Sequence, residues 1–528
     1  MCKCMAMAKW AALAIAVIAF ALSALTAVNS GIGWDAPFEV ELSSVLLNTS
    51  ANTNSVEALR QAVATQDLSK GPQLFWLANA LAAILPGDGL TTEMDDPRNY
   101  LLLGLSSVLL GSAGLIALAS ALGYALRRPL VGWLALAAMS TMPLWVGLAA
   151  VDYRDTQVAS GLSAVTAAGV LCVANRSGVM RLWATAGLSG LGTYIAIAGR
   201  SGSVLLVTVI AAWIAAVALV LGRKNVIESI RTVVAFGAGT LVGGALAVVS
   251  HPLGRFDPMG WLVEAVQFAS DNPNVMLVRV MGRNITSDQS PWWYVPAWLL
   301  AQLPLASLLV AAVSVFGLVL LKPRLSAASG EIGPIIILLG QAVLLPVLIL
   351  LARPNVYDGI RHFLFLIPAL FSAITVIVWS LRNRELPISL GERRIGEALV
   401  TWSLISMTAL SLFAAARWYP YSYAFVNPVA GAVKEPRIWE YDYWGLTTRE
   451  AGARLQREYG TTMVFVRPGA RSALPFGGKE FEEYLENPNR EWAGVTFFRF
   501  DAELPVDCEI DFTISRDGIP LAEAGRCS

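Results

Sequence analysis

The residues best suited to chemistry are acids that closely follow apolar segments. Asp35 lies between Trp34 and Pro37, a few residues after the first apolar segment, and Glu39 follows one helical turn later. A carboxylate held between an aromatic ring and a proline, at the level of lipid head groups, is placed to act as a general base on a hydroxyl. Trp34 and Glu39 are then predicted substrate contacts. A helix-capping aspartate on a surface loop is the alternative for Asp35.

A second acidic motif occupies the very short connection between the third and fourth apolar segments. It reads Asp152-Tyr153-Arg154-Asp155. Two acids around an arginine in so tight a turn cannot lie far apart. Asp155 is therefore a second candidate catalytic residue, with Asp152 and Arg154 as predicted substrate contacts, although a solvated turn would show the same pattern.

Basic residues cluster at the same predicted membrane face. Arg200, Arg353 and Arg361 each lie at the end of an apolar segment, and the only two histidines, His251 and His362, fall at this face as well. Arginine offers a fixed fork of donors that matches phosphate, and it stays charged when partly desolvated. Each residue alone would serve to anchor a helix end. Their convergence favours a phosphate-binding role for Arg200, Arg353, Arg361 and His362.

Aromatic residues accompany these charges. Trp292 and Trp293 precede the eighth apolar segment, and Tyr357 and Asp358 lie in the stretch that leads to Arg361. Interfacial belts of Trp and Tyr are common in membrane proteins, but sugar rings also stack on such side chains. These four residues are predicted to contact the substrate.

Composition identifies the elements that must position these residues. Of 528 residues, 56% are hydrophobic and 14% charged, against roughly 25% charged in a typical soluble domain. A formal net charge of zero gives no support to nucleic-acid binding. A spanning helix needs about 20 mainly apolar residues, so the chain is predicted to be an all-α polytopic membrane protein with about eleven transmembrane helices. The apolar runs lie near 10–28, 99–122, 130–151, 157–175, 182–199, 202–222, 232–250, 295–321, 332–352, 362–381 and 397–416.

The basic residues predict the orientation of these helices. With the N-terminus in the cytoplasm, fifteen Lys and Arg fall in cytoplasmic segments and seven in the opposite short loops, as the positive-inside rule requires. The first run resembles a signal peptide, but no convincing cleavage site follows, so it is predicted to remain as a helix. The Ala- and Val-rich helices favour a bacterial inner membrane.

Three long segments then face the exterior: residues 29–98, residues 251–294 and everything after about 417. The first holds two amphipathic stretches, Val56 to Thr65 and Gln73 to Leu85, that predict helices along the membrane surface. Residues 1–445 are predicted to form the membrane module. Residues 446–528 are predicted to form a small α/β exterior domain, with strands near 462–466 and 495–500.

Two cysteines bracket the last twenty residues of this predicted domain. If the domain lies outside the cytoplasm, Cys508 and Cys527 can form a disulfide. Two free thiols are the alternative. Cys2 and Cys4 precede a hydrophobic segment without a nearby histidine and indicate no site.

The ordered combination of motifs resembles the GT-C-fold glycosyltransferases that use lipid-linked sugars, and among them the protein O-mannosyltransferase and aminoarabinose transferase group. The resemblance lies in the two acidic motifs, the YDGIRHFLF stretch from Tyr357 to Phe365, the Asn427-Pro428 segment that ends in DYWG at 442–445, and the PWWYVP entry at 291–296. It covers roughly residues 10 to 450. The chain departs from the family in having Trp-Asp-Ala where relatives have a paired acid, and Tyr-Arg-Asp-Thr where they have Lys-Asp before a proline.

The resemblance implies inverting transfer of a hexosyl or pentosyl group from a polyprenyl-phosphate donor to a hydroxyl of a glycan, lipid or protein, at the exterior face. Asp35 would take the acceptor proton, and Arg200, Arg353 or Arg361 would stabilise the leaving phosphate. Asp155 would orient a substrate, or join Asp35 around a divalent cation such as Mg²⁺ or Mn²⁺. Such a donor is already activated, which suits a chain without a phosphate loop of Walker or Rossmann spacing.

Two other functions stay open on the sequence. A lipid-linked glycan transporter or flippase would usually need ionisable groups at mid-depth, and these are few in the apolar runs. An O-antigen ligase or polymerase usually relies on arginines and a histidine in one large exterior loop. The 251–294 loop carries such residues, namely His251, Arg255, Arg279 and Arg283.

Overall fold

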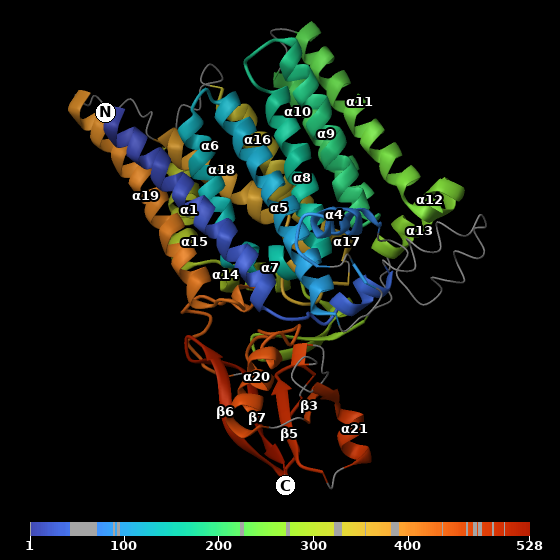
Figure 1. Ribbon diagram of the computed structural model, residues 1–528. Helices are drawn as coiled ribbons and strands as arrows, with labels where there is room; N and C mark the ends of the chain where they lie inside the picture. Colours follow the sequence, from blue (N-terminus) through green and yellow to red (C-terminus); the bar gives the residue numbers. More distant parts are fainter. Residues whose placement is uncertain are drawn as a thin grey trace.

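The computed structural model shows a bundle of long helices with a small sheet domain at one end (Figure 1). It describes residues 2–42, 71–87, 90–91, 96–221, 226–270, 275–321, 330–353, 355–381, 390–435, 437–460, 463–467, 472–473, 478–487, 490–500 and 502–527. The end of the bundle that carries the sheet domain is called the domain end below, and the opposite end the far end. The predicted surface helix Val56 to Thr65 lies outside the described residues.

Helices form wherever the sequence is continuously apolar, because a helix satisfies every backbone polar group within its own segment. The bundle consists of α1 (Cys2–Asn29), α5 (Pro97–Ala125), α6 (Pro129–Ser140), α7 (Pro143–Val151), α8 (Tyr153–Cys172), α9 (Val179–Gly199), α10 (Ser203–Leu221), α11 (Val226–Ser250), α14 (Tyr294–Gln302), α15 (Leu305–Leu321), α16 (Ile332–Leu339), α17 (Leu345–Ala352), α18 (Leu366–Leu381) and α19 (Leu390–Arg417). A single π-helical turn, Gly340–Leu344, joins α16 to α17. Helix α8 packs against α5 and α9, and α9 against α11.

The chain is a multi-pass membrane protein, but a count of eleven spans is not confirmed. Among the described residues, seven helices are long and apolar enough to cross a membrane, or up to nine if each of two bent pairs is one span. Helix α8 shows why fewer helices than expected are apolar enough to count as spans. All of its residues are buried among other helices, so it can carry polar side chains such as Gln157 and Thr166 that a lipid-facing helix would exclude.

Shorter elements line the domain end of the bundle. They are α4 (Gln73–Ala82), α12 (Pro252–Phe256), α13 (Pro258–Ser270), a hairpin of β1 (Leu277–Val280) and β2 (Arg283–Thr286), and the 3-10 helices Ser287–Gln289, Arg361–Phe363 and Ser422–Ala424. Helix α4 falls within the amphipathic stretch predicted from Gln73 to Leu85 and buries Leu74, Phe75 and Ala78.

The C-terminal domain is a five-stranded mixed sheet with two helices. Its elements are α20 (Thr448–Tyr459), β3 (Val464–Arg467), β4 (Gly478–Glu480), α21 (Phe481–Glu486), β5 (Trp492–Phe497), β6 (Cys508–Arg516) and β7 (Ile519–Cys527). The strand order is β4-β3-β5-β7-β6, with β3 parallel to β4 and β5 and the remaining pairs antiparallel. Ala451 and Leu455 of α20 pack into the core beneath the sheet. Cys508 and Cys527 face each other on β6 and β7 and form a disulfide.

The C-terminal domain packs directly on the segment that follows α1. The ring of Trp34 lies 6.3 Å from that of Phe497 and 6.5 Å from that of Phe500, measured between centroids. The Ser472 hydroxyl donates to the Ile32 carbonyl. Trp418 Nε1, at the end of α19, donates to Asp517 over 2.9 Å. The residues around Asp35 are therefore held between the bundle and the sheet domain.

Candidate active site

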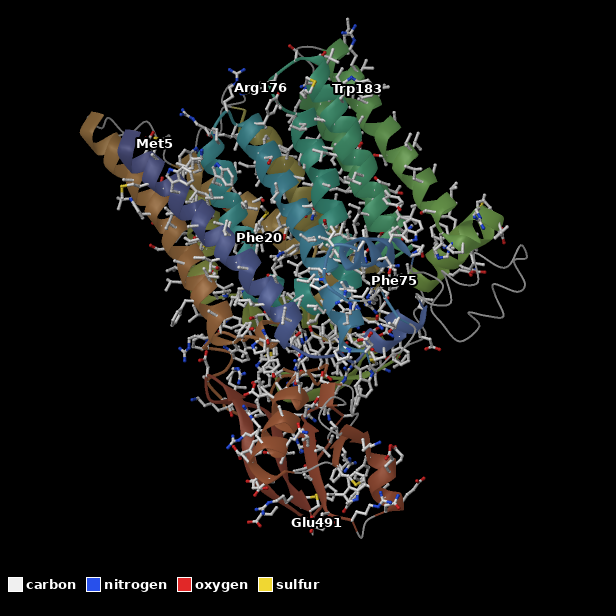
Figure 2. The ribbon with its side chains drawn as sticks, viewed as in Figure 1. Met5, Phe20, Phe75, Arg176, Trp183 and Glu491 are labelled. Carbon is white, nitrogen blue, oxygen red and sulfur yellow. A yellow bond between two sulfur atoms is a disulfide. The ribbon has the colours of Figure 1, made fainter. Side chains whose placement is uncertain are left out.

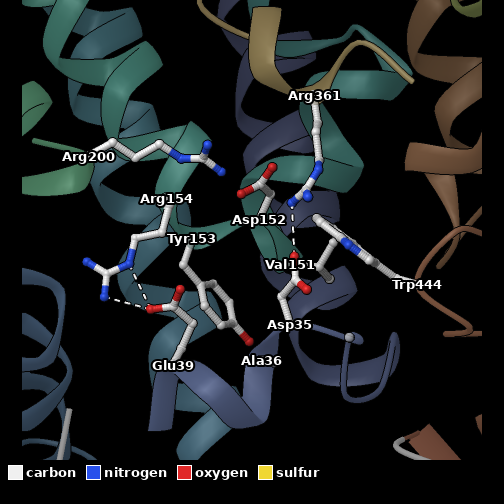
Figure 3. A pocket seen from close by; sticks show the side chains of 11 residues that line it. Asp35, Ala36, Glu39, Val151, Asp152, Tyr153, Arg154, Arg200, Arg361 and Trp444 are labelled. Carbon is white, nitrogen blue, oxygen red and sulfur yellow. Dashed lines mark hydrogen bonds and ion pairs between the residues drawn. The ribbon is translucent and has the colours of Figure 1, made fainter. Parts of the chain in front are cut away.

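A small polar cavity of about 30 Å³ lies at the domain end of the bundle (Figure 3). Residues from five separate parts of the chain line it: the segment after α1, the α7–α8 connection, the end of α9, the turn before α18 and the segment before α20. The lining residues include Asp35, Glu39, Asp152, Arg154, Arg200, Arg361 and Trp444. Six of these seven were predicted as site residues from the sequence, and the structure brings them together.

Local geometry fixes the two acidic motifs. Gly31 adopts a φ of +100° directly after α1, and a Cβ there would lie 3.0 Å from the Ser472 hydroxyl. The backbone conformation at this position therefore requires glycine. The chain is helical again from Ala36, which places Asp35 and Glu39 on one side of the cavity (Figure 3). In the second motif, Asp152 ends α7 and caps α8 by accepting from the Asp155 amide over 3.1 Å.

Arg361 is the central cation of the cavity. Its Nη1 donates to Asp35 Oδ2 over 3.1 Å, and its Nη2 lies 3.0 Å from Asp358 Oδ2. The Arg361 side chain is 4% exposed, whereas that of Asp35 is 42% exposed. The guanidinium also faces the rings of Tyr357 and Trp444, at 5.1 and 5.4 Å. A buried, rigid arginine thus presents Asp35 at the opening of the cavity.

Arg200 forms the second cationic side of the cavity. It binds Asp155 with two nitrogens, Nε at 3.0 Å from Oδ1 and Nη2 at 3.3 Å from Oδ2. Asp152 lies between Arg200 and Arg361 (Figure 3), and its Oδ2 accepts no hydrogen bond from the described residues. Burial raises the pKa of Asp152 well above its ordinary value, and the charge of Asp155 adds to this, while Arg361 and Arg200 oppose it. The cavity therefore combines two arginines with one buried carboxyl whose pKa is raised.

Arg154 and Glu39 form a separate ion pair at the edge of the cavity. Arg154 Nη2 lies 2.6 Å from Glu39 Oε2, and Arg154 Nη1 donates to the Gly71 carbonyl over 2.8 Å. Both side chains are buried, and the guanidinium faces the Phe75 ring at 5.1 Å. This pair connects the second acidic motif to the segment after α1 and to α4.

His362 is held as a neutral imidazole next to Arg361. Burial lowers its pKa well below the ordinary value, and the Arg361 charge lowers it further. Its ring meets the Tyr357 ring edge-on at 4.8 Å, and its Nε2 has no hydrogen-bond partner among the described residues. A neutral imidazole can donate or accept one hydrogen bond but does not add charge for a phosphate.

Eight predicted site residues do not line the cavity. Asp155, Tyr357 and Asp358 contact its arginines, and His362 packs on Tyr357. The other four lie elsewhere. Arg353 is exposed at the end of α17, with a left-handed backbone (φ 51°). Trp292 is 76% exposed, and Trp293 packs partly buried against the bundle core. Trp34 contacts the C-terminal domain. Any substrate contact by these residues stays a prediction.

The most important residue that sequence reasoning missed is Arg499, which follows β5 in the C-terminal domain. Its side chain is 1% exposed, and its Nη2 donates to Asp358 Oδ1 over 2.7 Å. Its Nε lies 3.4 Å from Glu440 Oε1, and its Nη1 donates to the Tyr443 carbonyl. Asp358 thus bridges Arg499 to Arg361. The only sequence signal was a single arginine within the apolar run Val495 to Phe500.

The DYWG segment owes its shape to Asp442. Its Oδ1 accepts from the Leu446 amide and its Oδ2 from the Thr447 amide, each over 3.0 Å. Gly445 in the same turn has a φ of +65°, and a Cβ there would lie 2.7 Å from the Phe497 ring. This turn sets Trp444 against the cavity and brings the sheet domain close to it.

Glu440 is predicted to make the thermal stability of the protein depend on pH. Burial raises its pKa from 4.5 to about 7, although Arg499 opposes the shift. Between these values the unfolded chain loses the proton while the folded chain keeps it, so this group's contribution to stability falls as pH rises. Glu440→Gln removes the titration and retains an oxygen for Arg499. We expect its Tm, relative to that of the unmodified protein, to rise between about pH 5 and about pH 7.5 in thermal unfolding; a pH-independent difference would contradict this assignment.

The donor set does not suit a cation shared by Asp35 and Asp155. Each of these carboxylates already pairs with its own arginine. No group of three or more His, Cys, Asp or Glu side chains in the described part of the chain is arranged to hold a metal ion. A hard divalent cation takes several oxygen ligands, and these two paired carboxylates do not supply them.

The helical bundle, the cavity at one end and the sheet domain beyond it define a membrane protein with the GT-C fold. No family model and no curated protein sequence matches the chain. Among solved structures, ArnT from Cupriavidus metallidurans bound to undecaprenyl phosphate is similar, with 12% identity over 97% of both chains and a TM-score of 0.51. The apo state of the same enzyme gives a TM-score of 0.49 over 97% of both chains. An Archaeoglobus fulgidus oligosaccharyltransferase gives 0.42, with 11% identity over 77% of this chain and 57% of that one. At these identities the likeness to ArnT shows the fold, as the sequence motifs predicted.

Proposed function

We propose that this protein is a membrane glycosyltransferase that moves a sugar from a polyprenyl-phosphate donor to an acceptor hydroxyl with inversion. The observation that carries the proposal is the half-exposed Asp35 carboxylate, held at the mouth of the cavity by the buried Arg361. A carboxylate so placed can accept a proton from a hydroxyl, and the arginine beside it can bind a phosphate. The solved ArnT structure with undecaprenyl phosphate supports a lipid-linked donor.

The cavity has room for about one water, so binding must rearrange its ion pairs. The donor phosphate takes the place of carboxylate oxygens on Arg361 and Arg200, which exchanges one charge-assisted pair for another. Asp35 is then released from Arg361, and its carboxylate can accept the proton of an acceptor hydroxyl. Donor binding and activation of the base are thereby linked through Arg361.

In the transfer step the acceptor oxygen attacks the anomeric carbon and Asp35 takes its proton. The bond between that carbon and the phosphate oxygen breaks, and its electron pair leaves with the polyprenyl phosphate. Arg361 and Arg200 stabilise the charge that develops on this leaving group. Attack from the face opposite the phosphate inverts the anomeric configuration.

We assign the domain end to the extracytoplasmic side of a bacterial inner membrane, with the N-terminus in the cytoplasm. The distribution of Lys and Arg supports this orientation. A disulfide in the C-terminal domain agrees with an oxidising compartment. Polyprenyl-linked sugars would then be used on the exterior face.

The test of the proposal is donor turnover. The purified full chain is incubated with a panel of polyprenyl-phosphate sugars, hexoses and pentoses among them, with a cell-envelope extract as the source of acceptor. We expect release of free polyprenyl phosphate from one donor class, detected by mass spectrometry. Movement of a lipid-linked glycan across vesicles without any change in mass would overturn the proposal in favour of a transporter.

Removal of divalent cations gives a separate prediction. Because the proposed step stabilises the leaving phosphate with Arg361 and Arg200 and not with a cation, we expect turnover to be unchanged within about twofold after treatment with EDTA. Turnover is measured before and after chelation and again with added Mg²⁺ or Mn²⁺. Loss on chelation with recovery on addition of either ion would show that a cation belongs to the mechanism.

A further inference from the structure

Two cavities meet at the far end of the bundle, away from the candidate active site. The first, the far-end groove, has a volume of about 780 Å³ and runs between α1, α5 and α6 past apolar side chains such as Phe20 and Leu136. The second, the far-end cavity, measures about 860 Å³ and lies among α5, α8, α9, α11 and α16. Both volumes fall in the range of roughly 300–1,000 Å³ that is typical of small-molecule sites.

The two cavities share three residues, Tyr124, Arg127 and Arg176. Figure 2 shows Phe20 at mid-height of the bundle and Arg176 near its far end, so the groove extends from the membrane interior to the basic residues. This arrangement matches the parts of a phospholipid in order. The apolar groove suits an acyl tail, the two arginines suit a phosphate, and the polar cavity suits a head group.

Each of the two shared arginines contacts a neighbouring residue and is available to an anion. Arg176 stacks on the Tyr124 ring at 4.2 Å, and Arg127 Nη2 donates to the Asn175 carbonyl over 3.1 Å. Neither makes an ion pair with an acid in the described part of the chain. Arg127 also adopts a φ of 54°, a left-handed backbone conformation that is uncommon for a residue other than glycine.

The charged residues that line the two cavities favour a ligand with a negative charge. The described lining of the groove includes no acid. The acid that lines the far-end cavity, Glu228, is bound by Arg181. Hydroxyl and amide groups, among them Ser177, Thr232 and Asn175, complete the cavity. The positive charge of the two arginines disfavours a cationic ammonium head group. The hydroxyl and amide groups favour a head group that carries hydroxyls.

We infer that the far-end groove and cavity bind one anionic phospholipid with a hydroxylated head group, of the phosphatidylglycerol type. One acyl chain lies in the groove along α1, the phosphodiester binds Arg127 and Arg176, and the glycerol head group enters the far-end cavity. The lipid comes from the leaflet opposite the C-terminal domain, and the inference does not depend on the proposed transfer reaction.

Native mass spectrometry of the detergent-purified full chain tests this inference. Phosphatidylglycerol, phosphatidylethanolamine and a polyprenyl phosphate are added separately and in equimolar mixtures. We expect one phosphatidylglycerol to be retained in preference to the other two. Arg127→Gln and Arg176→Gln should each weaken retention about tenfold, because each removes a charge-assisted hydrogen bond to the phosphate.

Two further variants separate site binding from a general attraction to basic residues. Arg128, next to Arg127, is exposed and lines neither cavity, so Arg128→Gln should retain lipid like the unmodified protein. Ser120 is exposed on α5 and lines the groove. Ser120→Trp should therefore reduce retention with both arginines intact. Equal retention of phosphatidylethanolamine, preference for the polyprenyl phosphate, or equal loss in Arg128→Gln and Arg127→Gln would each overturn the inference.

Discussion

Replacing Asp35 with asparagine is expected to lower the turnover of the polyprenyl-phosphate donor about 10²–10⁴-fold, the usual contribution of a general base. The donor phosphate displaces residue 35 from Arg361 in the proposed mechanism, and a neutral asparagine competes for this arginine no more strongly than the carboxylate, so KM should not rise. The measurement is initial-rate release of polyprenyl phosphate over a range of donor concentrations. A loss confined to kcat would assign Asp35 to the chemical step.

A matched control for Asp35 is Asp288→Asn. Asp288 is an exposed acid at the same end of the bundle and does not line the cavity. Its substitution should leave kcat and KM unchanged. The role of Asp35 as base would be refuted by near-normal turnover in Asp35→Asn, and a role in donor binding would be indicated by a rise in KM alone.

Replacing Arg499 with methionine is expected to destabilise the folded protein by about 3–5 kcal/mol, because it removes the cation that two buried acids share and leaves Asp358 with Arg361 alone. Asp358 is 2% exposed and Glu440 4% exposed, so neither carboxylate can recover its hydration. The Tm in detergent should fall accordingly. Turnover should fall as well, since Arg361 shares Asp358 with Arg499 and would lose its fixed position.

Two variants distinguish a positioning role from simple loss of charge. Arg499→Lys keeps the charge but has no fork to reach Asp358, Glu440 and the Tyr443 carbonyl together, so it should restore Tm more fully than turnover. Arg526 lies in the same domain and pairs with Asp511 while 57% exposed, so Arg526→Gln should leave the Tm nearly unchanged. Equal effects of Arg499→Met and Arg526→Gln would contradict the assignment.

These contacts make the C-terminal domain part of the site. Arg499 reaches Asp358 across 141 positions of the sequence, and Trp34 contacts both Phe497 and Phe500. The domain therefore fixes the geometry of the cavity in addition to any contact with an acceptor.

The sequence by itself determined the membrane class, the apolar segments that form the helices and most of the residues that line the cavity. A bilayer excludes unpaired backbone groups and most charges, so a spanning segment consists mainly of consecutive apolar residues. The polar residues that remain at the ends of these segments are few, and several of them share one end. For that reason Asp35, Asp152, Arg200 and Arg361 could be selected without a structure.

Only the tertiary structure decided which charges meet. Asp35 and Arg361 are 326 positions apart, and Arg154 and Glu39 are 115 apart, so no local spacing encodes either pair. The same is true of Arg499, which looked like part of a strand and is instead the partner of Asp358. A buried charge must find an opposite charge at hydrogen-bond distance to offset the loss of hydration. The partner it finds depends on how the helices and the sheet domain pack, which single segments do not specify.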